Sequence, residues 1–172
     1  LGITAPTVGR YLEYMEGAFL ITRLQPWFIN TKKRLVKSPK IYIRDTGILH
    51  NRLKIADMDD LLGHHAAGNS WEGFVIEQIR QLKPAHLDMY FYRTHQGAEI
   101  DLLLVKGAKA IASIEIKLST APVISKGFYQ SIQDLKTKHN YIIMPSGESY
   151  QTKEKITICS LLEFVKDYLK QL

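Results

Sequence analysis

"GAEIDLLLVKGAKAIASIEIKLS", residues 97–119, predicts two apolar strands joined by a turn near Gly107. Alternate residues of a strand share a face, so Glu99 and Asp101 should point the same way. The opposite face of the first strand should then be apolar, with Ile100, Leu102 and Leu104. Either the charged face of this hairpin is simply exposed to solvent, or its charged groups bind a ligand.

The second strand of the hairpin places Glu115 and Lys117 on one face, and Ile114, Ile116 and Leu118 on the other. Pairing through the turn brings Asp101 and Glu115 side by side. Two close carboxylates repel unless a cation or a proton intervenes, and Mg²⁺ prefers oxygen ligands of this kind. A metal beside Lys117 could activate a water molecule and stabilise a pentavalent phosphate. The alternative is an ordinary polar face of a half-exposed sheet.

The segment "SWEGFVIEQIRQL", residues 70–82, predicts a helix with Ser70 as its N-cap. Its apolar face comprises Trp71, Val75, Ile79 and Leu82. Glu72 lies at the edge of that face, from which a carboxylate can point into a cleft. Glu77 lies far from it and is expected to face solvent.

The C-terminal unit, residues 70–172, predicts the order α-β-β-β-α-β-β-α, which indicates an α/β domain with a mixed sheet flanked by helices. The later strands are "HNYIIMP" and "KITICS", and the helix after the hairpin is "FYQSIQDLKT". That helix carries Gln130 and Gln133, either of which could face the hairpin charges.

Residues 1–48 predict a helix between Thr4 and Gly17, then a strand, a basic turn and a second strand. This order is that of the end of a winged helix-turn-helix, so we expect a partial winged helix here and a linker over residues 49–69. A wing can contact phosphates or dock a protein, and the sequence leaves both open.

The charge of the chain is concentrated in its first third. The net charge of the 172 residues is +6, and residues 1–54 alone hold ten Lys or Arg against three acids. A localised basic excess favours a DNA-facing surface. The expected nucleic-acid contacts are Lys32, Lys33, Arg34 and Lys37 at the wing, with Arg93 and Gln130 from the C-terminal unit.

Composition narrows the cellular setting. No apolar run approaches the ~20 residues that span a bilayer, and the single Cys159 forms no internal disulfide. We therefore expect a cytoplasmic protein without a membrane partner. The chain begins at Leu1 and not at a Met, which suggests a fragment of a longer protein. The sequence is also compatible with a homo-oligomer.

Glu72, Asp101 and Glu115-Ile116-Lys117 together resemble the motif of the PD-(D/E)XK nuclease superfamily. The resemblance implies a restriction-endonuclease-like fold, with Asp101 and Glu115 binding a divalent metal, Mg²⁺ or Mn²⁺. It also implies that Lys117 orients the attacking water and that Glu72 is a further metal or water ligand. The residue before the metal-binding Asp is Pro in that superfamily and Ile100 here.

The wider chain is similar to the C-terminal region of prokaryotic AAA+-like ATPases known as domain of unknown function 4143. The similar segments include "KSPKIYIRDTGIL", "WEGFVIEQI", "GAEIDLLL" and "IEIKLS". The resemblance implies an ATPase domain in the same full-length chain, absent here because residues 1–172 contain no G-x-x-x-x-G-K-[ST] motif. The expected function is metal-dependent hydrolysis of a DNA phosphodiester. The alternatives are a non-catalytic nucleic-acid-binding or partner-binding regulatory module, and an assembly domain.

Overall fold

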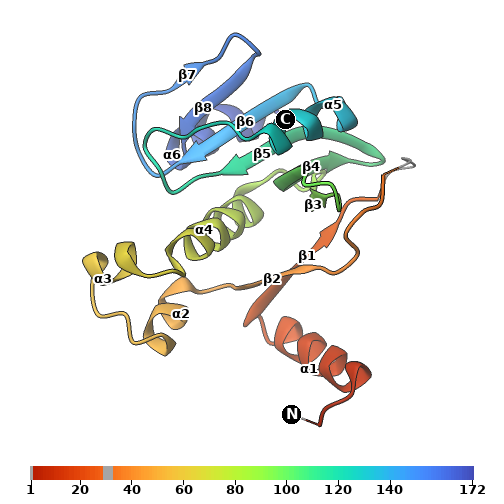
Figure 1. Ribbon diagram of the computed structural model, residues 1–172, viewed down its shortest axis with the longest axis vertical. Coiled ribbons are helices and arrows are strands. Elements are labelled where there is room, and N and C mark those ends of the chain that lie inside the picture. The colour runs from red at the N-terminus through yellow and green to blue at the C-terminus, as the bar shows by residue number, and fades with distance from the viewer. Residues whose placement is uncertain (1, 29–32) are drawn as a thin grey trace.

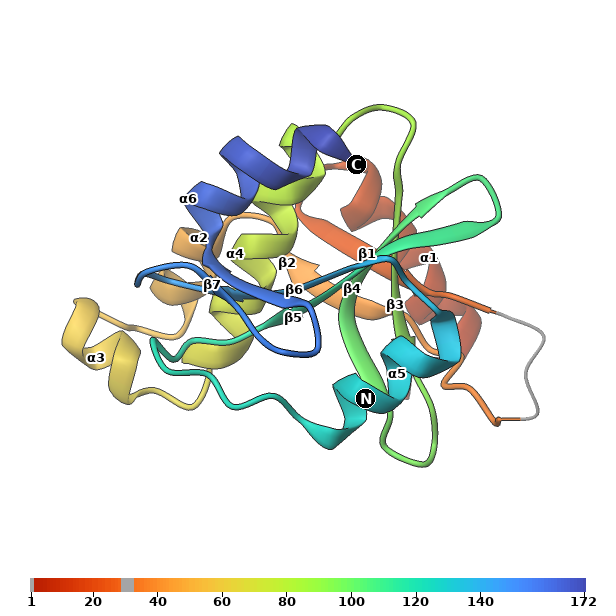
Figure 2. The ribbon, with the colours of Figure 1, turned by 90° about the horizontal axis from the view of Figure 1, so that it is seen from above.

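A mixed sheet with helices on both faces organises the computed structural model, which describes residues 2–28 and 33–172 (Figures 1 and 2). The sheet has eight strands in the order β2-β1-β3-β4-β5-β6-β8-β7. Their bounds are β1 (Ile21–Pro26), β2 (Lys40–Ile43), β3 (Asp88–Arg93), β4 (Glu99–Lys106), β5 (Lys109–Ile116), β6 (His139–Met144), β7 (Tyr150–Gln151) and β8 (Ile156–Ser160).

Six α-helices accompany the sheet among the described residues. They are α1 (Ala5–Gly17), α2 (Thr46–Arg52), α3 (Met58–Gly63), α4 (Ala67–Leu82), α5 (Lys126–Leu135) and α6 (Leu161–Glu163). The last helix continues as a π-helical turn over Phe164–Tyr168 and a 3₁₀ turn over Leu169–Gln171. Mixed α/β architecture is thus confirmed.

Two hydrophobic layers sandwich the sheet, one on each face. The first packs α4 and the C-terminal helix against the strands, through residues such as Val75, Ile79 and Phe164. The second packs α5 through Phe128, together with Ile142 and Ile158. Figure 2 shows α4 and α6 on one side of the sheet and α5 on the other. Burial of these faces is the main stabilising contribution to the fold.

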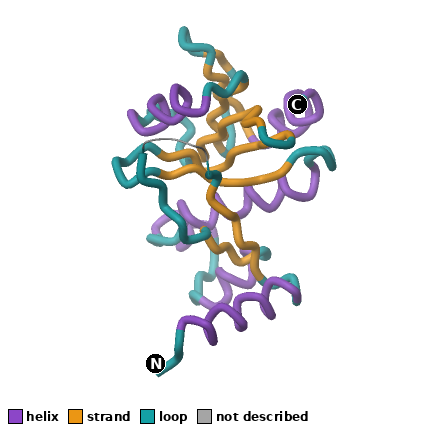
Figure 3. Tube along the Cα trace, turned by 90° about the vertical axis from the view of Figure 1, so that its right-hand side faces the viewer, coloured by secondary structure: helices purple, strands orange, loops and turns teal. Residues whose placement is uncertain are grey.

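The N-terminal hairpin extends the same sheet. β1 pairs with β2 in antiparallel fashion and with β3 in parallel fashion, with Gln25 opposite Tyr90. Helix α1 precedes the hairpin and projects at the N-terminal end of the molecule (Figures 1 and 3), and none of its residues is buried. The predicted order of a helix followed by two strands is confirmed, whereas most of the predicted basic turn lies outside the described residues. The two strands lie beside those of the C-terminal unit.

Helix α4 begins earlier than predicted. It starts at Ala67, so Ser70 lies inside the helix and is not its N-cap. Ser70 is buried, and its hydroxyl lies 2.6 Å from Nε2 of His50 on α2. A Ser inside a helix is acceptable when its hydroxyl has such a partner.

The predicted solvent position of Glu77 is wrong, because only 5% of this residue is exposed. Its carboxylate accepts hydrogen bonds from Arg44 at 2.9 Å and from Arg80 at 2.7 Å. The N-terminal β1–β2 hairpin lies over the face of α4 that a helical wheel assigns to solvent. Tertiary packing therefore buries Glu77 with its charge partners, which a single-helix pattern cannot reveal.

A β-bulge in β4 changes the alternation predicted for the hairpin. Tyr92 pairs with Ile100 and Tyr90 with Leu103, so Asp101 and Leu102 together oppose Phe91. Ile100 consequently packs on the α5 side, whereas Leu102 packs on the α4 side. The prediction that these two residues share a face is wrong. The turn at Gly107, with φ of 60°, is confirmed.

No helix in the described part of the chain has both the length and the apolar character required to cross a membrane. The short strand β7 was not predicted, since two residues carry no usable alternation.

Candidate acidic site at the β4–β5 fork

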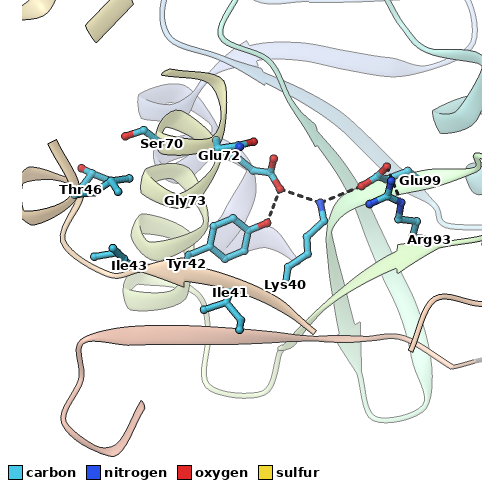
Figure 4. Close-up of a pocket in the computed structure, with 12 residues that line it drawn as sticks. Lys40, Ile41, Tyr42, Ile43, Thr46, Ser70, Glu72, Gly73, Arg93 and Glu99 are labelled. Atoms are coloured by element: carbon cyan, nitrogen blue, oxygen red, sulfur yellow. Dashed lines mark hydrogen bonds and ion pairs between the residues drawn. The ribbon is translucent and has the colours of Figure 1, made fainter. Parts of the chain in front are cut away.

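The ammonium group of Lys40 lies among three carboxylates (Figure 4 shows two of them). Its Nζ atom is 2.9 Å from Oε1 of Glu72, 3.1 Å from Oε1 of Glu99 and 3.1 Å from Oδ1 of Asp101. Lys40 opens β2, Glu72 lies on α4, and the other two lie on β4. Three elements distant in the sequence therefore meet at one cationic atom.

Tyr42 lies two residues after Lys40 on β2, and therefore on the same face of the strand. Its hydroxyl donates a hydrogen bond of 2.5 Å to Oε1 of Glu72. Gly73 permits this approach, because a Cβ atom there would stand 3.2 Å from Cδ1 of Tyr42. The close packing of β2 on α4 thus depends on the residue next to Glu72.

The charges of the site shift the pKa values of both β2 side chains. Burial by itself lowers the pKa of Lys40, but attraction to Asp101, Glu72 and Glu99 outweighs it and raises the pKa well above its ordinary value. Burial and the charge of Glu72 likewise raise the pKa of Tyr42. Lys40 is therefore a cation and Tyr42 a neutral donor throughout the physiological range.

Asp101 stands where β4 and β5 separate. The backbone register between these strands ends at Leu102 opposite Ile114. Beyond it, Oδ2 of Asp101 accepts a hydrogen bond of 3.0 Å from the backbone N–H of Ile116. The carboxylate therefore bridges the fork with one oxygen and contacts Lys40 with the other.

Glu115 and Lys117 form an ion pair beside this fork, with Nζ 2.7 Å from Oε1. Burial raises the pKa of Glu115, and Asp101 adds to the rise while Lys117 opposes it. The second oxygen, Oε2, is buried and has no hydrogen-bond partner in the part of the chain that the structure describes. Trp71 of α4 donates from Nε1 to the carbonyl oxygen of Lys117 at 3.0 Å, which holds the strand end against the helix.

Lys40, Glu72, Glu99 and Asp101 form a group that we call the Lys40 cluster. A cavity of about 640 Å³ adjoins it. Its charged and polar lining includes Lys40, Tyr42, Thr46, Glu72, Arg93 and Glu99. Arg93, which the sequence analysis names as a nucleic-acid contact, approaches Glu99, with Nε 3.4 Å from Oε2. The acidic cluster is therefore open to solvent and to ligands on this side.

The three predicted metal ligands supply carboxylate oxygens, but each of these carboxylates contacts a lysine ammonium group. Glu72 and Asp101 share Lys40, and Glu115 contacts Lys117. Within residues 2–28 and 33–172, no three His, Cys, Asp or Glu side chains are grouped as a metal site. Two carboxylates converging on one cation and an unpaired buried Oε2 of Glu115 nevertheless fit a divalent ion by donor type.

Lys33 and Gln130, two of the predicted DNA contacts, lie near the turn between β3 and β4, at the same end of these strands as Arg93 and Glu99. Lys33 contacts Asp134 of α5, with Nζ 2.6 Å from Oδ1, and Gln130 donates to the same oxygen at 3.1 Å. Lys33, Lys126 and Gln130 line a hollow of about 370 Å³. Arg34 and Lys37 are exposed in the loop between β1 and β2. Lys32 lies outside the described residues.

Sequence reasoning missed Lys40 and Tyr42. Their signal was the alternation in "KIYI", in which both polar groups fall on one face of a strand. That face only acquires meaning once β2 is known to lie against α4. Of the two glutamines predicted to face the hairpin charges, Gln130 instead donates to Asp134 on the same helix.

Comparisons with known proteins give families without an assigned activity. The family described as "Domain of unknown function (DUF4143)" matches residues 67–164, and "Domain of unknown function (DUF8612)" matches residues 1–59. The "Uncharacterized protein Rv2008c" of Mycobacterium tuberculosis and the "Uncharacterized protein Mb2031c" of Mycobacterium bovis are each 36% identical over 91% of this chain. The match spans 35% of the length of those relatives. No solved structure matches the chain significantly.

Proposed function

Because the chain belongs to the DUF4143 family, whose description assigns no activity, we propose its function from the site itself: metal-dependent hydrolysis of a DNA phosphodiester by a PD-(D/E)XK-like domain. The observation that carries the proposal is the position of Asp101. It joins the Lys40 cluster to the β4–β5 fork, beside the Glu115–Lys117 pair. The four motif side chains, from α4, β4, β5 and the residue directly after β5, thus lie around one strand fork.

The order of elements supports the same proposal. Helix α4 is followed by the antiparallel run β3-β4-β5, then by α5 and by β6 parallel to β5. Glu72 lies on α4, Asp101 lies on β4, and Glu115 and Lys117 lie at the end of β5. The PD-(D/E)XK motif that the sequence resembles has its charged residues on the corresponding helix and strands.

Glu72, Asp101 and Glu115 would hold the divalent ion through their carboxylate oxygens. A bound ion supplies a polarised phosphate oxygen and a more acidic water. Lys117 holds its ammonium beside Glu115, where it can orient that water and offset charge on the phosphate. The buried Oε2 atom of Glu115 has no hydrogen-bond partner within residues 2–28 and 33–172, so we propose it as an oxygen ligand.

DNA would reach the site over the basic loop between β1 and β2 and the hollow at α5. Exposed Arg34 and Lys37 are suited to phosphate contacts, which depend on charge rather than on base identity. Lys126 at the start of α5 and Gln130 one turn later offer further donors. In the full-length protein we propose that this module serves an ATPase domain elsewhere in the chain.

A second candidate function is a non-catalytic regulatory module that binds DNA or a partner. It is favoured by one observation, the Lys40 ammonium, which already compensates Glu72 and Asp101. In this case the carboxylates hold β2 against the fork, and no metal takes part.

Incubation of the chain with plasmid DNA and Mg²⁺ or Mn²⁺ tests the first candidate. Wild-type protein should nick or linearise the plasmid, and Asp101→Ala and Lys117→Ala should not. Asp88→Asn, an exposed carboxylate at the start of β3, is the matched control and should cleave normally. Cleavage that persists in both site variants, or that needs no metal, contradicts the proposal. Salt-sensitive DNA binding without cleavage supports the second candidate.

A further inference from the structure

Lys40 occupies the point on which the carboxylates of the site converge, and it comes from outside the domain that carries them. The DUF4143 match begins at residue 67, whereas β2 lies within the DUF8612 match over residues 1–59. Resting on the proposed function, we propose that Lys40 is a tethered cation that competes with a divalent metal for Glu72 and Asp101. The N-terminal hairpin thereby keeps the site closed to metal until the Lys40 side chain moves.

Geometry is the first support for this proposal. One ammonium nitrogen lies within 3.1 Å of oxygens from Glu72, Glu99 and Asp101. A metal ligated by Asp101 would use Oδ1, because Oδ2 accepts a hydrogen bond from the backbone N–H of Ile116, and it would lie closer to Oδ1 than Lys40 does. Two cations this close to one oxygen repel each other, so Lys40 and the ion compete for Asp101 and for the neighbouring carboxylate of Glu72.

Charge is the second support. Among the described residues, Lys40 is in direct contact with Glu72 and Asp101, whereas Arg93 approaches Glu99 and Lys117 contacts Glu115. A single positive charge opposite two carboxylates leaves the cluster acidic. A divalent ion in its place would balance the pair, which gives metal an electrostatic advantage once Lys40 withdraws.

Space is the third support. Lys40 itself lines the open cavity of about 640 Å³, together with Thr46 and Asn69. Its side chain has four rotatable bonds and can turn into this cavity without movement of β2. The backbone of the hairpin can then remain paired to β3, while Tyr42 still holds Glu72 in position.

The test measures Mn²⁺ affinity, by electron paramagnetic resonance and calorimetry, in wild type, Lys40→Met and Lys40→Arg. Met keeps the length of the side chain without its charge, and we expect Lys40→Met to bind Mn²⁺ at least about tenfold more tightly than wild type. Lys40→Arg keeps the charge and should bind no more tightly than wild type. Lys106→Met, an exposed lysine at the far end of β4, is the control and should not change the affinity.

Thermal melting provides a second readout, because an ion that binds only the folded protein raises its melting temperature. Mn²⁺ should raise the melting temperature of Lys40→Met more than that of wild type. If Lys40→Met does not fold, the double variant Lys40→Met/Glu99→Gln, which also removes one negative charge, is measured in its place.

Equal Mn²⁺ affinity in wild type and Lys40→Met, or no binding in either, overturns the proposal, since Lys40 then excludes no metal. Equal gains from Lys40→Met and Lys40→Arg also overturn it, because charge is then not the cause. Plasmid cleavage separates this result from the proposed function. Tighter Mn²⁺ binding without cleavage leaves the tethered cation standing and removes the nuclease. Wild-type cleavage with metal affinity unchanged in Lys40→Met does the reverse.

Discussion

The Nζ atom of Lys40 lies 3.1 Å from Oδ1 of Asp101, which ties the edge strand β2 to the inner strand β4 across two intervening strands of the sheet. Asp101 is only 15% exposed at its side chain and Lys40 19%, so solvent screens the contact weakly. The contact couples the N-terminal hairpin to the acidic site. Stability and metal binding should therefore both respond to changes on β2.

Glu77→Ala should lower the free energy of unfolding by about 3 to 5 kcal/mol, because it leaves Arg44 and Arg80 without their shared buried partner. Urea denaturation measures this value. Glu16→Ala is the matched control, since Glu16 pairs with Arg23 at a side chain that is 38% exposed, and it should lose less than about 1 kcal/mol. Similar losses in both variants would contradict a structural role for Glu77.

Tyr42→Phe should lower the free energy of unfolding by about 1 to 2 kcal/mol, because the hydroxyl donates to the partly buried carboxylate of Glu72. Chemical denaturation at neutral pH measures the change. Tyr14→Phe, at a residue of α1 that is 76% exposed, should leave stability unchanged. A Tyr42→Phe protein as stable as wild type would show that the hydrogen bond contributes nothing net.

Acid should weaken the attachment of the β1–β2 loop to α5. Burial alone would raise the pKa of Asp134, but hydrogen bonds from Lys33, Gln130 and Tyr92 outweigh it and hold the pKa below its usual value. A carboxyl with a lowered folded pKa stabilises the protein above its unfolded pKa, and this contribution is lost as pH falls through the folded value.

Asp134→Asn should therefore be less stable than wild type near neutral pH, and the difference should shrink in strong acid. Urea unfolding over a series from pH ~7 to pH ~2 measures the trend. Asp88→Asn is the control and should run parallel to wild type at every pH. A constant difference between Asp134→Asn and wild type across the series would rule out titration of this carboxyl as the cause.

Gly127→Ala should destabilise the protein by about 1 to 3 kcal/mol, because a Cβ atom there would collide with the carbonyl oxygen of Gly97 in the turn between β3 and β4. Gly68→Ala is the comparison in α4, where a Cβ atom meets nothing within 4 Å. That change should raise stability by about 0.5 to 1 kcal/mol. Thermal melting of both variants measures the contrast, and equal shifts would argue against the close approach of α5 to this turn.

Much of the fold follows from local pattern. The alternation in residues 97–119 predicts β4 and β5, and a glycine at position 107 predicts the turn between them, where the structure gives it a positive φ. Asp45 is the N-cap of α2, and its side chain accepts from the backbone N–H groups of Gly47 and Ile48. Such features depend on neighbours in the chain, so the sequence carries their full signal.

The site divides differently. Glu72, Asp101, Glu115 and Lys117 could be selected from residue type and spacing, and the structure brings them to one strand fork. The face assigned to Glu77 was wrong because helical periodicity describes one helix and not what packs on it. Leu102 changed sides because a bulge opposite Phe91 adds a residue to β4, and the register of two strands decides where a bulge falls.

By itself, the sequence determined which side chains could carry the chemistry, because residue type and strand or helix period are local properties. Only the tertiary structure decided what those side chains face. The pairing of β1 with β3 brings β2 onto α4, and this places the ammonium of Lys40 among the carboxylates of Glu72, Glu99 and Asp101. The distance between charges depends on the packing of segments far apart in the chain, which no local pattern records.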